Sequence, residues 1–92
     1  MARRNQFIIS NSMAKPLLLA IEPEGSFYPL QKGQEVSVTD RYTSAPVTVK
    51  VTNSEQGDTI LSIWPGDGDV TIEKDGVDVL DLVQTALDVR SE

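Results

Sequence analysis

Residues 47 to 52 alternate strictly between valine and a polar side chain. The valines occupy positions 47, 49 and 51, and two threonines and Lys50 occupy the positions between and after them. Because successive side chains of a β-strand point to opposite faces, this period predicts a strand with one buried face. We therefore expect Val49 in a hydrophobic core and Lys50 in solvent, so that Val49→Asp would bury an unpaired charge and unfold the protein.

Further short runs of extended character occupy most of the chain. They cover residues 6–11, 17–22, 27–30, 34–39, 59–64, 70–72 and 77–79. Glycine, proline, asparagine or aspartate interrupts the chain between them, and no helical segment separates one run from the next. Strands joined without a helical crossover pair antiparallel, and many strands in one short chain form two sheets packed face to face. The sequence thus predicts an all-β fold, a small antiparallel β-sandwich of about seven strands.

The C-terminal stretch changes its period. From Val79 onward, apolar residues fall on one helical face, and Asp78 stands where a helix N-cap would stand. We expect a short C-terminal helix or a frayed tail. Residues 1–82 are the predicted β-sandwich domain. Residues 83–92 are a tail that the domain does not need for folding, because an isolated helix of that length is marginal in water.

The segment EPEG at positions 22–25 raises the question of an acidic active site. Glu22 and Glu24 flank Pro23, and paired carboxylates hydrolyse glycosides when they face each other across a cleft. Proline and glycine nevertheless end the preceding strand, and Gly25 can take a positive φ. We therefore expect a turn at this position and no catalytic residue.

The composition limits both chemistry and partners. The 92 residues include neither histidine nor cysteine, which removes common zinc and copper ligands and histidine-dependent nucleophiles. The net charge is −6, so nucleic acid is not an expected partner. No apolar run is long enough for a membrane span or a signal peptide. We expect a non-enzymatic cytoplasmic protein that has no cofactor and does not bind membranes.

The acidic C-terminal half contains a candidate calcium site. Asp67 and Asp69 occupy the first and third positions of a possible EF-hand-type loop, and Asp75 adds a third carboxylate. Ile72 stands where such a loop needs glycine, and the local alternation fits a strand better. A weak calcium site is therefore the alternative to acidic hairpin tips that keep strand edges from pairing with other chains.

Two aromatic residues are candidates for ligand binding. Trp64 lies at the end of a predicted strand, directly before the turn PGDGD. An exposed tryptophan there would offer a platform for a polyol or a peptide, whereas a buried one would fill the core and bond its N–H to the backbone. Tyr28 carries the same two alternatives.

Part of the sequence resembles a set of small bacterial proteins of unknown function. Their pattern is an asparagine, Pro-Leu, an apolar strand into Glu-Pro-x-Gly, then Tyr-x-Leu and a glycine. The matching residues are Asn11, Pro16, Leu17, Glu22, Pro23, Gly25, Tyr28, Leu30 and Gly33. The later DGVDVL is similar to their closing hairpin, whereas Glu24 stands where many of them have tryptophan. The resemblance implies a compact all-β domain and no known activity.

The distribution of charge bears on function. Residues 1–53 carry six basic and four acidic side chains, whereas residues 54–92 carry two basic and ten acidic ones. Such asymmetry can orient one molecule against another, although charge also serves solubility alone. We expect a non-enzymatic binding or interaction module, either for an unknown protein partner or for self-association. The alternative is a weak calcium- or polyol-binding domain that uses the acidic 67–81 segment and Trp64.

Overall fold

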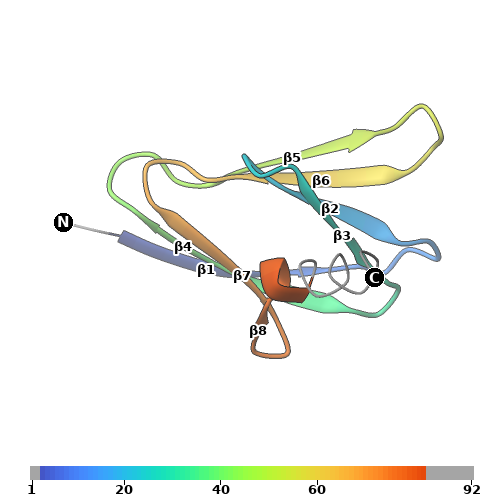
Figure 1. Ribbon diagram of the computed structural model, residues 1–92, viewed down its shortest axis with the longest axis horizontal. Helices are drawn as coiled ribbons and strands as arrows, with labels where there is room; N and C mark the ends of the chain where they lie inside the picture. Colours follow the sequence, from blue (N-terminus) through green and yellow to red (C-terminus); the bar gives the residue numbers. More distant parts are fainter. Residues whose placement is uncertain (1–2, 83–92) are drawn as a thin grey trace, which may run out of the picture.

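Two four-stranded sheets pack against each other in the computed structural model, which describes residues 3–82 (Figure 1). Sheet 1 has the strand order β1-β4-β7-β8, and sheet 2 has the order β3-β2-β6-β5. The strands of sheet 1 are β1 Arg3–Ser10, β4 Glu35–Tyr42, β7 Asp69–Lys74 and β8 Val77–Asp78. The strands of sheet 2 are β3 Ser26–Leu30, β2 Leu17–Ile21, β6 Thr59–Trp64 and β5 Thr48–Asn53. The prediction of an all-β sandwich is confirmed.

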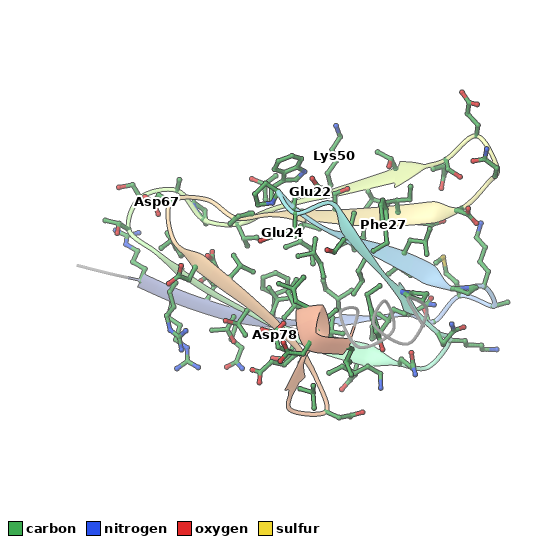
Figure 2. The ribbon with its side chains drawn as sticks, viewed as in Figure 1. Glu22, Glu24, Phe27, Lys50, Asp67 and Asp78 are labelled. Carbon is green, nitrogen blue, oxygen red and sulfur yellow. The ribbon has the colours of Figure 1, made fainter. Side chains whose placement is uncertain are left out.

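A short helical turn at 79–82 follows β8, as the change of period predicts. Asp78 caps it, because its Oδ1 accepts the backbone N–H of Leu80 at 2.8 Å (Figure 2). The described part of the chain holds no helix that is long and apolar enough to cross a membrane. The predicted tail, 83–92, lies outside the described residues, so its boundary and its dispensability stay predictions.

The expectation that all strands pair antiparallel is wrong for one pair. β2 and β6 run parallel, with Leu17 opposite Thr59 and Ile21 opposite Ile63. Parallel neighbours need a long connection, and here the intervening chain forms β3, β4 and β5. A local period shows which face of a strand is apolar, but it does not show which distant strand lies beside it.

The core lies between the inner faces of the two sheets. β2 is a central strand, as its continuous apolar run predicts, and Leu19 within it is completely buried. Val36 and Val38 of β4 are separated by one residue and therefore share a face, and both are buried on the inner side of sheet 1. The buried apolar cluster consists of Leu17, Leu19, Ile21, Leu30, Val36, Val38, Ile63, Ile72 and Val79. Every member is aliphatic, so β-branched and leucine side chains, rather than aromatic rings, fill the centre.

β5 has the clearest alternation in the sequence, yet all its residues are exposed. Val49 lies opposite Ile63 and therefore on the inner face of sheet 2, but 40 % of its surface is accessible. The prediction of a buried Val49 is wrong, and an aspartate there would reach water instead of unfolding the protein. Val49 is exposed because β5 is an edge strand of sheet 2. Sheet 1 does not cover the inner face of β5 in the described chain. Lys50 is exposed, as predicted.

Asp40 fixes the crossing from sheet 1 to sheet 2. Its side chain is completely buried near the end of β4, and its Oδ2 accepts the N–H of Val47 at 2.8 Å. The partly buried Val47 side chain packs against the core directly before β5. Asp40 Oδ1 is also buried and has no hydrogen-bond partner among the described residues. The start of β5 is therefore held against β4, while the rest of this strand is exposed.

Candidate functional site

Asp67, the first residue of the predicted calcium set, connects the β6–β7 loop to the loop that follows β4. It lies between β6 and β7, and its Oδ1 accepts the N–H of Thr43 at 2.9 Å (Figure 2). Its Oδ2 accepts the N–H groups of Ser44 at 2.7 Å and Ala45 at 3.0 Å. In return, the Asp67 N–H donates to the Ala45 carbonyl at 2.9 Å. The backbone hydrogen bonds from Thr43, Ser44 and Ala45 lower the pKa of the Asp67 carboxyl below its ordinary value, because they favour its charged form.

Asp67→Asn is expected to lower the melting temperature at neutral pH, and this difference from the wild type is expected to shrink in acid. The folded-state pKa of Asp67 lies below the ordinary value for an aspartate, 3.8. The stabilisation is therefore complete above that value and is lost as the pH falls through the lowered pKa. Melts followed by circular dichroism between about pH 7 and about pH 2 measure the difference.

Asp58→Asn is the matched control for this prediction. Asp58 is an exposed aspartate in the β5–β6 connection, and only its backbone groups form hydrogen bonds among the described residues. Its substitution is expected to leave the melting temperature close to that of the wild type across the same pH range. An Asp67→Asn difference that stays constant from neutral pH to acid would contradict the role of the charged carboxylate.

The structure does not bring the three predicted calcium ligands together. Both oxygens of Asp67 accept backbone N–H groups, and Asp69 begins β7. Asp75 lies in the turn after β7, where its Oδ2 contacts Lys74 Nζ at 3.0 Å. Residues 3–82 contain no group of three or more acidic side chains that is arranged to hold a metal ion.

Trp64 and Tyr28 lie on opposite faces of sheet 2. Tyr28 pairs with the buried Leu19 and packs its partly buried side chain against the core. Trp64 is 45 % exposed on the outer face. Phe27 of β3 lies on the same outer face and is 50 % exposed. The sequence reasoning missed this residue. The sequence pattern could have identified Phe27, because alternation along β3 places Phe27 and Tyr28 on opposite faces.

The segment from Glu22 to Gly25 forms the turn between β2 and β3, as predicted. The Glu22 N–H donates to the Ile63 carbonyl at 3.0 Å, and the Gly25 N–H donates to the Ile21 carbonyl at 3.0 Å. Gly25 has a φ of 73°, in the region that glycine favours. Glu22 and Glu24 are also among the residues that line a cavity of about 200 Å³ between the sheets, which we call the end cavity. Nothing in the sequence indicates this cavity, because its other walls come from distant strands.

The strand edges of the two sheets differ in how well they are protected. β3 contains Pro29, which has no N–H to donate, and β8 has only 2 residues. The long edges are β1, with 8 residues, and β5, with 6. β1 begins with Arg3 and Arg4, and charged side chains on an edge oppose pairing with another chain. β5 carries one charge, on Lys50, and presents two exposed valines on its inner face. It is the least protected edge in the described chain.

Fold and surface together define a small all-β sandwich domain with one open apolar edge. No protein family, no characterised protein and no solved structure matches this chain. The resemblance to small bacterial proteins therefore stays a prediction. The structure does connect three positions of that pattern, since Asn11 Nδ2 donates to the Leu30 carbonyl and the Gly33 N–H donates to the Asn11 carbonyl.

Proposed function

We propose that this protein is a non-enzymatic interaction module that self-associates through the free edge of β5. The observation that carries the proposal is the exposure of Val51, which is 63 % accessible although it lies on the inner face of sheet 2 opposite Leu61. On the other strands of sheet 2, side chains of the same inner face belong to the buried core. An apolar strand edge with unpaired backbone groups is a template for another strand.

A second copy supplies a strand of matching length and character. Antiparallel pairing of two β5 strands about a two-fold axis joins both copies of sheet 2 into one continuous sheet. An axis at Val51 sets the two Val51 side chains opposite each other and places Lys50 opposite Thr52 of the second copy. An axis at Lys50 would instead oppose two like charges, which is destabilising. The Val51-centred register is therefore the favoured one.

The absence of histidine and cysteine from the sequence supports a role in binding rather than catalysis. The charge asymmetry of the sequence is compatible with the same proposal. β5 lies in the basic half of the chain, and Lys50 is its single charged residue. Self-association through β5 therefore brings few like charges together, and all of the acidic side chains belong to other segments.

Sedimentation velocity at a low and a high micromolar concentration tests this proposal. The wild type is expected to shift from monomer towards dimer as the concentration rises. Val51→Asp is expected to weaken the dimer at least about 10-fold, because two carboxylates then face each other at the axis. The monomer fold should survive, since the side chain at this position reaches water.

Ile8→Asp is the matched control. Ile8 is an aliphatic residue on the other long edge, β1, and is 57 % exposed. This variant introduces the same charge and is expected to associate like the wild type. A wild type that is monomeric at both concentrations would overturn the proposal. Equal weakening of the dimer by the two variants would place the interface away from β5.

A further inference from the structure

The sequence contains two Asp-Gly pairs, and the structure places them in different environments. They are Asp67–Gly68, in the β6–β7 connection, and Asp75–Gly76, in the two-residue turn between β7 and β8. An aspartate before a glycine is open to attack by the backbone on its own side chain, because glycine has no side chain that shields its nitrogen. The same chemistry is therefore available at two places, and their surroundings decide where it proceeds.

The reaction is an intramolecular ring closure. The glycine backbone nitrogen forms a bond to the carboxyl carbon of the aspartate side chain, and the carboxyl hydroxyl group leaves with the proton of that nitrogen as water. Water then opens the cyclic imide at either of its carbonyl carbons. One opening returns aspartate, and the other gives isoaspartate, in which the main chain runs through the side-chain carbon. The neutral carboxyl is the reactive form, because a hydroxyl group leaves from it more easily than from a carboxylate.

At Asp67 the fold opposes this ring closure. Both carboxylate oxygens accept backbone N–H groups of residues 43–45, at 2.7–3.0 Å. These hydrogen bonds lower the pKa of the Asp67 carboxyl and keep it in the charged, unreactive form. The backbone of Gly68 lies directly against that of Arg41 in β4. The carboxyl and the attacking nitrogen therefore cannot move together unless the β6–β7 loop leaves β4.

At Asp75 the two reacting groups are free to move. The Asp75 side chain is 86 % exposed, and its one polar partner among the described residues is Lys74 Nζ at 3.0 Å. An ion pair this exposed constrains a side chain little. A Cβ built on Gly76 would meet no atom within 4 Å, so the space around the attacking nitrogen is open.

The turn that contains Asp75 is also strained and weakly held. With a φ of 53°, Asp75 is the one non-glycine residue of the described chain in the left-handed region, which a side chain disfavours. β8 pairs with β7 through Val77 and Asp78 alone. A turn closed by so short a ladder opens more readily than the core strands do. Opening relieves the strain at Asp75 and lets the Gly76 nitrogen reach the carboxyl.

From these two environments we infer that Asp75 is a modification site, at which the protein forms isoaspartate while Asp67 is protected. The product has one more main-chain carbon within a two-residue turn. The pairing of Lys74 with Val77 and of Glu73 with Asp78 depends on that turn. The modified protein is therefore expected to lose β8 and the cap that Asp78 provides for the helical turn at 79–82.

Incubation of the full chain in heavy-oxygen water at mildly acidic pH tests this assignment. Each ring opening places one labelled oxygen in the product, so peptide mass spectrometry after digestion in ordinary water counts the events at each Asp-Gly pair. In the folded protein, residue 75 is expected to gain label at least about 10-fold faster than residue 67, because three hydrogen bonds must break before Asp67 can react. Chromatography of the isomeric peptides then measures the isoaspartate.

The same chain unfolded in urea is the matched control. There the two pairs are expected to gain label at similar rates, because the hydrogen bonds around Asp67 are gone. Asp75→Glu keeps the charge and is expected to abolish labelling at this position, since its longer side chain closes the ring much more slowly.

Two results would overturn the assignment of Asp75. In the first, the folded protein gains label at residue 67 as fast as at residue 75, or faster. In the second, the preference for residue 75 keeps its full size in urea, so that the local sequence alone explains it. Self-association through β5 plays no part in this chemistry and is measured separately by sedimentation, so the failure of either proposal leaves the other standing.

Discussion

Asn11→Ala is expected to lower the free energy of unfolding by about 3–5 kcal/mol, because each buried partner left unsatisfied costs about 1–3 kcal/mol. Asn11 is 2 % exposed, between β1 and β2. Its Nδ2 donates to the carbonyls of Leu30 at 2.8 Å and Lys15 at 3.0 Å, and its Oδ1 accepts the N–H of Met13 at 2.8 Å. Alanine removes all three hydrogen bonds, of which the one to Leu30 is buried and the two to Lys15 and Met13 are partly buried.

The backbone of Asn11 extends this connection to the β3–β4 turn. Its N–H donates to the Gln34 carbonyl at 3.0 Å, and its carbonyl accepts the N–H of Gly33 at 2.7 Å. One residue therefore joins the β1–β2 connection, the end of β3 and the turn after it. Since these segments belong to both sheets, loss of the side chain is expected to loosen their connection and to lower the stability of the whole sandwich.

Urea unfolding followed by circular dichroism measures the loss for Asn11→Ala. Asn53→Ala is the control, because the Asn53 side chain makes an exposed hydrogen bond with Thr59, and surface substitutions usually change stability by less than about 0.5 kcal/mol. Asn11→Asp keeps the shape and the Oδ1 acceptor but loses both donors, so it should not restore stability. If Asn11→Asp is as stable as the wild type, the donated hydrogen bonds do not hold the sandwich together.

Gly68→Ala is expected to lower the free energy of unfolding by at least about 3 kcal/mol, at the upper end of overpacking effects. A Cβ built on Gly68 would lie 1.6 Å from the carbonyl oxygen of Arg41 and 2.9 Å from the Cα of Tyr42. Both neighbours are backbone atoms of β4, so no side-chain rotation can relieve the clash. The β6–β7 loop must move away from β4, and Asp67 with it.

Gly57→Ala separates this steric effect from the general cost of replacing a glycine. Gly57 has a φ of 87° and open space where a Cβ would lie, so its substitution is expected to cost only the conformational strain, about 1–2 kcal/mol. Urea unfolding compares the two variants. A Gly68→Ala protein that is as stable as Gly57→Ala would show that the loop relaxes away from β4 at little cost.

A double-mutant cycle tests whether Gly68 and Asp67 act together. If Gly68→Ala pushes the loop away from β4, the three hydrogen bonds that Asp67 accepts from residues 43–45 are already weakened. Asp67→Asn should then change the melting temperature less in the Gly68→Ala background than in the wild type. Additive changes in melting temperature would mean that the clash at position 68 and the hydrogen bonds of Asp67 affect the stability of the protein independently.

The sequence alone determined the local elements of this protein. Alternation along residues 34–39 places Val36 and Val38 on one face of a half-buried strand, and both are buried on the inner face of β4. The Glu22–Gly25 turn and the Asp78 cap also followed from residue type. These features depend on contacts within a few residues, because backbone sterics fix the strand period, the left-handed glycine and the N-cap.

The tertiary structure decided which of these faces are covered and what the turns do. Val49 has the same alternation as Val38, yet it is exposed because β5 ends its sheet while β4 lies inside its own. Gly68 looks like an ordinary turn glycine in the sequence, but it permits the contact with β4. Glu24 and Asp69 line one cavity only because their segments meet across the sandwich. Each outcome depends on chain segments distant in sequence, and a local pattern carries no information about which of them will meet.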